Sequence, residues 1–446
     1  MESKLLPNQE PVFKTGHLHV ITLILYLLAM LSLASCTDDC ETTVTYTTQE
    51  PILLKRSDLV QAIKSEPAQS LHTTGKIYAK DRYVFVNELY KGIHVIDNSN
   101  PAAPKNIAFI NIPGNVDMAI RGNILYADAG PDLITLDISN PAQATVKNYT
   151  LNLFPNYTFT GAASNPQASD LLTVGYTTRI VTESRPADCG SSGSGTGGGG
   201  VFMNDRSQFL NAASMNNSTG STGVGGSMAR FTITGDYLYA VNPSSIQVVD
   251  ITQPASPVRG TNVPTSWNTE TIFPYQDKLF LGTSSGMLIY DNSQPQQPKF
   301  ISAISHFFGC DPVVVDGNFA YVTVRNGTEC RTGNNINQLE IIDISTIQNP
   351  RRIKTYAMQN PHGLGIDRET LFLCEGDYGL KVFNAQNVLK IDENKLAHFK
   401  DIHAFDVIPL GNTLLAVGND GLYQYDYSNP KQIKLLSKIP VTKNQQ

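Results

Sequence analysis

The sequence has little charge and no excess of basic residues. Of its 446 residues, 16% are charged, and the formal net charge is −6. A protein that binds the phosphates of a nucleic acid needs clustered Lys and Arg side chains. No basic stripe of that kind is present, so a nucleic-acid partner is not expected. The composition is that of a mildly acidic folded protein.

Recognisable catalytic motifs are also lacking. The chain has no glycine-rich phosphate loop, no serine nucleophile elbow and no His-Glu-x-x-His zinc motif. An enzyme built on this chain would have to assemble its site from scattered loop residues. We therefore predict no catalytic residue, no cofactor and no metal site from the motifs alone.

What the sequence does contain is a short β-rich run that recurs. Residues 92–101 read Gly-Ile-His-Val-Ile-Asp-Asn-Ser-Asn-Pro, and the other copies keep this pattern. One Asp or Asn marks each copy, and the markers are Asp97, Asp137, Asp250, Asp291, Asp343, Asn384 and Asp426. Successive markers lie 40, 113, 41, 52, 41 and 42 residues apart.

A period near 41 residues with four short strands per unit is typical of a β-propeller blade. Seven markers predict an all-β fold, a seven-bladed β-propeller. The two long intervals then contain insertions of about 72 and about 11 residues. The competing interpretation places an eighth blade in the longest interval, but no second Asp-x-Ser-Asn-Pro turn occurs there.

The strand before each marker resembles the LVIVD-repeat family of propeller proteins. The resemblance is carried by residues 93–97, 134–137, 248–250 and 341–343 and extends over about residues 75–440. It implies a propeller architecture. It implies no activity, because no reaction can be carried over from the family.

The N-terminal residues 1–35 are expected to be a lipoprotein signal peptide. Residues 18–35 form an uncharged apolar run that ends in Leu33-Ala34-Ser35-Cys36, which resembles a bacterial lipobox. The thiol of Cys36 would receive the lipid anchor, and several acyl chains exceed what stable anchoring needs. The alternative is an uncleaved signal anchor, since about 18 apolar residues just span a bilayer.

The location expected from this anchor is the outer membrane. Asp38 and Asp39 follow the lipidated cysteine and resemble the surface-export signal of Bacteroidetes lipoproteins. The alternative is that the two aspartates only solvate a tether. We expect the cell surface, with the periplasmic face as the alternative.

Three regions follow from these patterns. Residues 36–70 are a lipid-anchored tether in which residues 51–54 could close the ring as an edge strand. Residues 71–446 form the propeller. Its insertion, about residues 152–225, is rich in Gly, Ser and Asn and is expected to be mobile, with short strands at 171–176 and 178–182.

Both insertions are expected on one face of the propeller, because innermost strands begin on the face where second and third strands are joined. Innermost-strand starts bring charged residues toward the channel mouth there. These candidate binding residues are Lys76, Asp117, Arg230, Asp311, His362 and Asp406. Such a ring could hold a polar ligand or a cation. The alternative is that these side chains satisfy backbone groups at strand ends.

The Asp-Asn-Ser-Asn-Pro turns offer oxygen atoms for calcium, but Asx-turn chemistry explains them better. In such a turn the Asp or Asn side chain accepts a hydrogen bond from the backbone N–H two residues on. We therefore expect these repeated turns to be structural and not calcium sites.

Five cysteines remain beside Cys36, in keeping with an exported, oxidising location. Cys310 and Cys330 belong to one blade and are expected on the face that carries both insertions, so we predict a disulfide between them. Cys189 could pair with Cys374 if the insertion folds back, and free thiols are the alternative. Cys40 would stay unpaired.

These predictions lead to a non-enzymatic binding module of the cell envelope that presents its loop-rich face to a protein or glycan. Two alternatives remain. One is an enzyme that acts on extracellular polymers at the channel mouth, with His362, His403 and the aspartates of the mouth in acid–base roles. The other is a periplasmic assembly scaffold.

Overall fold

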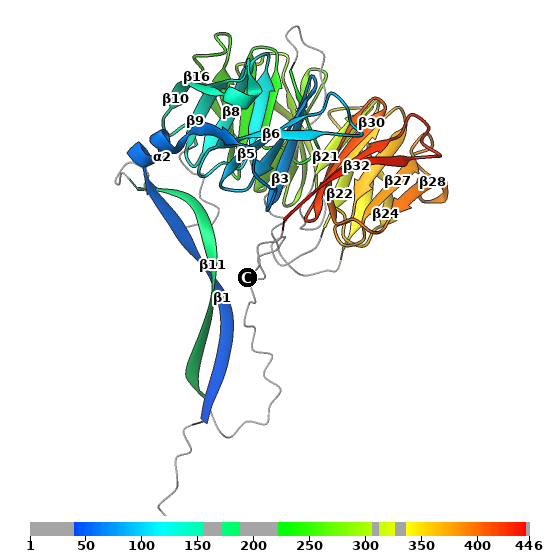
Figure 1. Ribbon diagram of the computed structural model, residues 1–446. Coiled ribbons are helices and arrows are strands. Elements are labelled where there is room, and N and C mark those ends of the chain that lie inside the picture. Colours follow the sequence, from blue (N-terminus) through cyan, green and yellow to red (C-terminus); the bar gives the residue numbers. More distant parts are fainter. Residues whose placement is uncertain (1–39, 155–170, 188–221, 306–311, 326–335, 443–446) are drawn as a thin grey trace, which may run out of the picture. The chain divides into compact units, whose positions relative to one another are not determined.

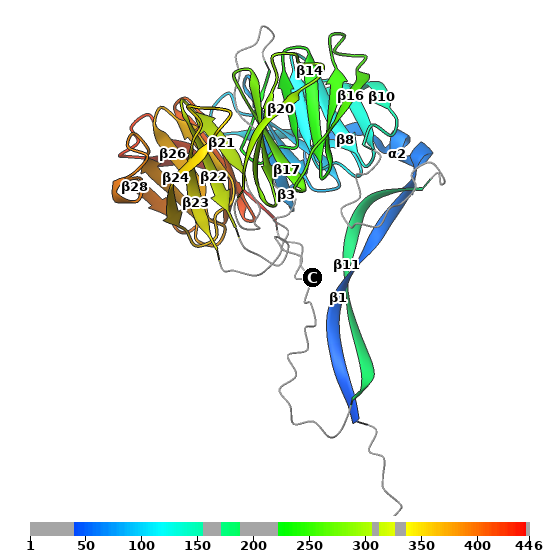
Figure 2. The same cartoon turned by 180° about the vertical axis from the view of Figure 1, so that it is seen from behind.

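The computed structural model describes residues 40–154, 171–187, 222–305, 312–325 and 336–442, and these residues form a seven-bladed β-propeller (Figures 1 and 2). Seven antiparallel sheets follow one another along the chain, six of four strands and one of six. The predicted fold is confirmed, and the described part of the long interval adds no eighth blade.

The four strands of each blade run from the channel outward. They are β3 (Thr74–Lys80), β4 (Tyr83–Glu88), β5 (Gly92–Asp97), β6 (Lys105–Asn111) in blade one; β7 (Met118–Arg121), β8 (Ile124–Ala129), β9 (Asp132–Asp137), β10 (Thr145–Thr150) in blade two; β13 (Phe231–Thr234), β14 (Tyr237–Asn242), β15 (Ser245–Asp250), β16 (Val258–Pro264) in blade three; and β17 (Thr269–Tyr275), β18 (Lys278–Thr283), β19 (Gly286–Asp291), β20 (Lys299–Ser305) in blade four.

The remaining blades repeat this order. Their strands are β21 (Val313–Asp316), β22 (Phe319–Val324), β23 (Gln338–Asp343), β24 (Arg351–Ala357) in blade five; β25 (Leu364–Asp367), β26 (Thr370–Cys374), β27 (Leu380–Asn384), β28 (Lys395–Phe399) in blade six; and β29 (Ala404–Leu410), β30 (Thr413–Gly418), β31 (Gly421–Asp426), β32 (Lys434–Pro440) in blade seven. Second and third strands are almost wholly buried, which explains their apolar sequences.

All seven marker residues form the predicted Asx turns. Asp97 Oδ1 accepts a hydrogen bond from Ser99 N at 2.9 Å, and the other six markers make the same contact with the residue two positions on. In the second turn, hydrogen bonds from the hydroxyl and then the backbone N–H of Ser139 lower the pKa of Asp137 to about 2. The turns are structural, as predicted.

The ring closes differently from the prediction. Residues 51–54 belong to β1 (Cys40–Lys55), which pairs with β11 (Leu171–Ala187) and not with the first or last blade. Closure instead joins Leu71 to Val441 in a parallel bridge, with Thr442 N donating to Leu71 O at 2.7 Å. The two predicted short strands of the insertion are one strand, β11.

The region expected to be a tether with a possible closure strand contains other regular elements as well. After β1 comes a short helix, α2 (Arg56–Ala62), which buries Leu59, and then β2 (Lys64–Pro67), which pairs with β6 at the outer edge of blade one. Arg56 forms an ion pair with Asp132 of blade two and donates to Asn152 Oδ1 at 2.8 Å. Leu172 at the start of β11 is buried in the same core.

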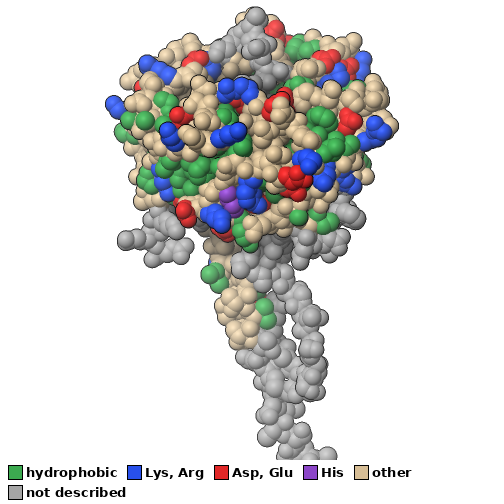
Figure 3. Space-filling view, turned by 90° about the vertical axis from the view of Figure 1, so that its right-hand side faces the viewer, with side chains coloured by type: hydrophobic (Ala, Val, Ile, Leu, Met, Phe, Trp, Pro, Cys, Tyr) green, Lys and Arg blue, Asp and Glu red, His purple; other side chains and the backbone are tan. Residues whose placement is uncertain are grey.

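The chain divides into two compact units. The smaller one contains, among the described residues, 40–48 of β1 and 180–187 of β11. Tyr46 Oη donates to Glu183 Oε1 at 2.7 Å between these strands. The larger unit holds the propeller, and Figure 3 shows basic and acidic side chains interspersed on one side of it.

No helix in the described ranges is long and apolar enough to cross a membrane. The predicted signal peptide and Cys36 lie outside those ranges.

Candidate functional site at the channel mouth

The central channel is crossed by a stretch of the chain itself. Residues 222–230, called the channel segment below, begin with Thr222 bridged to Arg121, the last residue of β7. The strand β12 (Val224–Gly225) pairs with Tyr78 and Ala79 of β3. The segment ends at Arg230, beside Asp117, which precedes β7. It therefore runs from the base of the channel, where innermost strands end, to the mouth, where they begin.

This path corrects the prediction for the long insertion. Its C-terminal end was expected to reach blade three from the loops on the mouth face. The structure brings it up through the channel, so Thr222 lies at the base. Residues 155–170 and 188–221 of the insertion are outside the described residues.

The glycines of the channel segment are needed for close packing. A Cβ on Gly223 would lie 2.2 Å from Tyr78 Cε1, and one on Gly226 would lie 2.4 Å from Asp406 Oδ2. Contacts this short would force the neighbouring atoms to move, so any larger residue is disfavoured at both positions. The glycine-rich composition, from which we predicted mobility, here lets the backbone pass close to the walls of a narrow channel.

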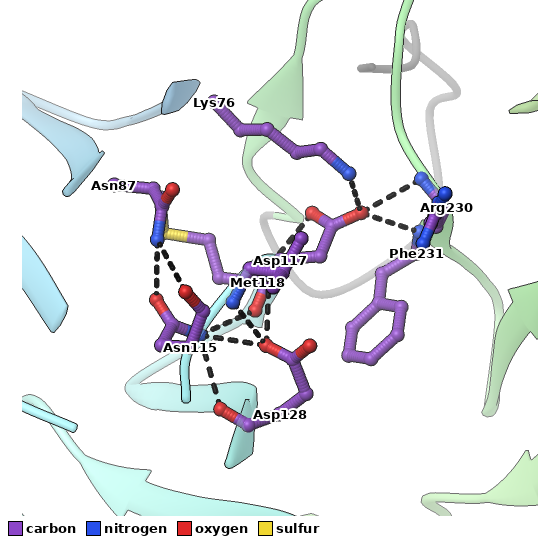
Figure 4. Close-up of polar contacts among 9 residues, drawn as sticks. Lys76, Asn87, Asn115, Asp117, Met118, Asp128, Arg230 and Phe231 are labelled. Carbon is purple, nitrogen blue, oxygen red and sulfur yellow. Dashed lines mark hydrogen bonds and ion pairs between the residues drawn. The ribbon is translucent and has the colours of Figure 1, made fainter. Parts of the chain in front are cut away.

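The mouth contains a buried ion pair between blades one and two. Lys76 Nζ lies 2.6 Å from Asp117 Oδ2, and the two residues are 2% and 1% exposed (Figure 4). The same oxygen accepts hydrogen bonds from the backbone nitrogens of Arg230 at 2.7 Å and Phe231 at 3.2 Å. Burial lowers the pKa of Lys76, although Asp117 opposes this shift. Asp117 thus ties the channel segment to two blades.

Three residues that the sequence did not single out extend this cluster. Asn87 Nδ2 donates to Asn115 Oδ1 at 2.7 Å, and Asn115 Nδ2 donates to Asp128 Oδ1 at 2.8 Å (Figure 4). Burial raises the pKa of Asp128 to about 7. Asn87 and Asp128 occupy the same position in the second strands of blades one and two. The available signal was an amide or a carboxylate at a position that holds no such group in the other five blades.

Asp406 of blade seven holds the middle of the channel segment. Its Oδ1 accepts a hydrogen bond from Ser227 N at 3.2 Å, while Ser227 Oγ accepts one from Leu364 N at 2.7 Å. Asp406 is 1% exposed, and burial raises its pKa to about 7. Within the described part of the chain, its Oδ2 has no hydrogen-bond partner.

His362 of blade six is also buried at the mouth, at 2% exposure, and its ring lies 5.6 Å from that of Phe405. Neither ring nitrogen has a hydrogen-bond partner among the residues that the structure describes. Burial, together with Arg325 and His403, lowers the pKa of His362 well below its usual value. The imidazole is therefore neutral at pH 7. His403 is more exposed and pairs with Asp377.

The structure thus brings five of the six predicted mouth residues to the channel, but not as one open ring. Lys76, Asp117 and the backbone of Arg230 form one cluster, whereas Asp406 belongs to blade seven, the ring neighbour of blade one, and His362 to blade six. Asp311 lies outside the described residues. In the ranges given above, no group of three His, Cys, Asp or Glu side chains is placed to hold a metal ion.

The disulfide predictions have different outcomes. Cys310, Cys330 and Cys189 lie outside the described residues, so the Cys310–Cys330 bond stays a prediction. Cys374 ends β26 as a free thiol and is fully buried. It packs with Phe372, Leu380 and other apolar side chains of blades six and seven, which enclose it. The structure therefore does not form the Cys189–Cys374 bond.

Comparison with known proteins agrees with this fold. The chain carries LVIVD repeats, since the model of the LVIVD repeat matches residues 73–109, 114–150, 225–265 and 310–329. Among curated proteins, none matches the sequence.

Solved structures share the architecture at low identity. A protein from Lactobacillus plantarum has 12% identity and a TM-score of 0.51, over 83% of this chain and 97% of its own. A periplasmic gluconolactonase from Pseudomonas aeruginosa has 12% identity and a TM-score of 0.47, over 83% and 98%. BamB from Moraxella catarrhalis has 8% identity and a TM-score of 0.42, over 86% and 98%. At 12% identity, the likeness to the Lactobacillus plantarum protein extends to the fold alone.

Proposed function

We propose that this LVIVD-repeat propeller is a lipid-anchored, non-enzymatic binding module of the bacterial cell envelope. The lipobox ending at Cys36 supports the anchor, and the outer membrane is the proposed location. Asp38 and Asp39 favour the cell surface over the periplasmic face. The partner is a protein or a glycan held by loops on the mouth face.

One observation carries the non-enzymatic part of this proposal. Two charged groups at the mouth are occupied inside the protein: Lys76 by Asp117, and Asp117 also by the backbone of the channel segment. A catalytic pair must reach a substrate atom. Lys76 and Asp117 are enclosed and already bonded, so they act as structural groups.

The binding surface then lies in the loops that surround the closed mouth. Loops on a rigid scaffold vary without cost to the core, and function concentrates there. The insertion of blade five, between β22 and β23, joins a second to a third strand and so belongs to this face. It separates these strands by more residues than in any other blade, which makes it the leading candidate.

The anchor is tested by mass spectrometry of the membrane-bound protein. Trypsin should release a peptide of residues 36–55, because Lys55 is the first Lys or Arg after Cys36. The proposal requires this peptide to carry acyl chains on Cys36. A peptide from the same region that begins upstream of Cys36, without lipid, would instead support the signal anchor.

The binding face is tested on a glycan array and in pull-downs from envelope extracts. In the first variant a Gly-Ser linker of equal length replaces residues 326–335; in the matched control the same exchange is made at residues 428–432, a third-to-fourth-strand turn on the base face. Loss of binding only in the first variant would support the proposal. Equal binding by both variants and the parent would contradict the face assignment.

A second candidate, an enzyme acting on extracellular polymers, is favoured by the unpartnered imidazole of His362. A neutral buried histidine without a hydrogen bond calls for an explanation, and a histidine must be neutral to act as a general base. Turnover that is abolished in His362→Gln but kept in His398→Gln, with both variants folded, would favour this candidate. No turnover by the parent on a broad panel of polysaccharides would remove it.

A further inference from the structure

A cavity lies in the base half of the channel, away from the buried ion pair at the mouth. Its volume is about 300 Å³. Blades four to seven contribute Phe273, Val314, Ile366 and Val407, and the channel segment contributes Val224 and Ser227. The volume is at the lower end of the roughly 300–1,000 Å³ typical of ligand pockets. It is about twice that of the engineered cavity of about 150 Å³ known to bind benzene.

The cavity arises because the channel segment lies to one side. Its strand β12 pairs with β3 of blade one, and Thr222 contacts blade two. The segment therefore fills the channel beside the first blades and leaves space against blades four to seven. Its backbone forms one wall of that space at Gly225 and Gly226.

Burial shows which way the cavity opens. Leu364, at the start of β25, and Val407, in the middle of β29, are fully buried, and Ser227 is 2% exposed. Asp316 and Gly411, where the innermost strands end, are exposed. The cavity is thus closed toward the mouth by the channel segment and open at the base. A ligand would enter with its apolar end first.

The open rim carries two carboxylates with different surroundings. Asp367 Oδ2 accepts hydrogen bonds from Tyr427 Oη at 2.8 Å and from Arg368 Nε at 2.9 Å, so it is occupied. Asp316 is exposed and makes no ion pair with any residue of the described ranges. A positively charged group that remains at the rim would gain from Asp316, whereas an anion would be repelled.

We propose that this cavity binds a small, mainly apolar molecule of roughly ten non-hydrogen atoms, with one amino group held at the rim by Asp316. The apolar part lies against Phe273, Val314 and Val407, where its burial supplies most of the affinity. The site is separate from the loops on the mouth face, so it does not depend on the partner proposed for them.

Three probes of similar size test the proposal by calorimetric titration at pH 7 and low ionic strength: 2-phenylethylamine, 2-phenylethanol and phenylacetate. We expect saturable binding of the amine, with an affinity at least about fivefold higher than that of phenylacetate and the alcohol in between. The absence of saturable binding by all three probes would overturn the proposal, as would an equal affinity of the amine and the acid.

The location is tested with Ile366→Trp, in which the larger ring fills the cavity. Ile366 is half-buried, so the ring can extend toward the open rim. The matched control is Ile124→Trp, a half-buried isoleucine at the base end of blade two that does not line the cavity. We expect amine affinity to fall at least about tenfold only in Ile366→Trp. Unchanged affinity in that variant would overturn the assignment.

Asp316→Lys provides a test that does not disturb the core, because Asp316 is exposed. It should reverse the preference, so that phenylacetate binds more tightly than 2-phenylethylamine. If the order of the two affinities stays the same, Asp316 does not hold the amino group and that part of the proposal is wrong.

Discussion

The two halves of the channel are made by the same seven innermost strands and yet differ in chemistry. At the mouth, charged and amide side chains are buried and bonded to one another and to the channel segment. At the base, apolar side chains line a cavity that opens at the surface. The segment crosses both halves but contacts blades one and two most closely at the base. The comparison shows that the channel segment, which is not part of any repeat, can make the two ends of a repetitive propeller channel chemically different.

The largest effect should come from breaking the buried ion pair at the mouth. Asp117→Asn keeps an acceptor for the backbone N–H groups of Arg230 and Phe231 but leaves Lys76 buried without a counter-charge. Removing one partner of a buried pair costs about 3–5 kcal/mol of unfolding free energy. Urea unfolding followed by circular dichroism measures this loss.

The double variant Lys76→Met, Asp117→Asn is the control, since it removes the charge together with its partner. It should recover most of the stability lost in Asp117→Asn. If the double variant is as unstable as the single one, the backbone contacts of Asp117 matter more than its charge.

The mouth should also make stability depend on pH. The pKa values of Asp128 and Asp406 are raised to about 7 by burial. Between about pH 4 and pH 7 the folded protein therefore holds protons that the unfolded chain has released, so stability falls as pH rises through this window. The slope is at most about 1.4 kcal/mol per pH unit for each carboxyl.

Urea midpoints measured from pH 5 to pH 8 test this dependence. Asp406→Asn should flatten the curve, because the amide does not titrate. His362, whose pKa is lowered, has the opposite slope below about pH 6.5 and offsets part of the effect of the two carboxyls, because the unfolded imidazole takes up a proton there. Glu88, whose pKa is lowered to about 2, adds to this opposite slope only near pH 5, where the unfolded chain begins to protonate. A parent protein that is equally stable at pH 5 and pH 7 would contradict the prediction.

A third test targets the passage of the channel segment between the two halves. Gly226→Ala places a Cβ against Asp406 Oδ2, and overpacking of this kind costs about 1–3 kcal/mol. Asp406→Ala in the same chain removes the clashing carboxylate. The combined loss should therefore be smaller than the sum of the single losses, and simple additivity of the two would refute the contact.

The smallest effect is expected outside the channel, in the repeated turns. Asp250→Ala removes the hydrogen bond from Thr252 N, which is 2.8 Å long, and should cost about 0.5–1 kcal/mol. Asp250→Asn should be nearly neutral, because Asn384 makes the same bond in blade six at 2.8 Å. The measurement is the shift in urea midpoint. A loss as large as that of Asp117→Asn would mean that the turns, and not the mouth, limit stability.

The repeat itself was readable from the sequence because its causes are local. Alternating burial sets the strands, and each Asp or Asn forms a hydrogen bond only two residues away, so every copy carries its own signal. The same reasoning found Lys76, Asp117 and Asp406, since strand starts could be counted from the markers. It missed Asp128 and Asn115, because neither residue lies at the start of an innermost strand.

Only the tertiary structure decided what occupies the channel. The glycines of residues 222–226 signalled a chain without a core of its own, but their packing against Tyr78 and Asp406 depends on residues far away in the sequence. The closing contact of Leu71 with Val441 and the cavity at the base are of the same kind. The sequence determined the seven blades because a periodic pattern repeats a local cause. Contacts made once, between distant segments, have no period, and they appear only when the ring has closed.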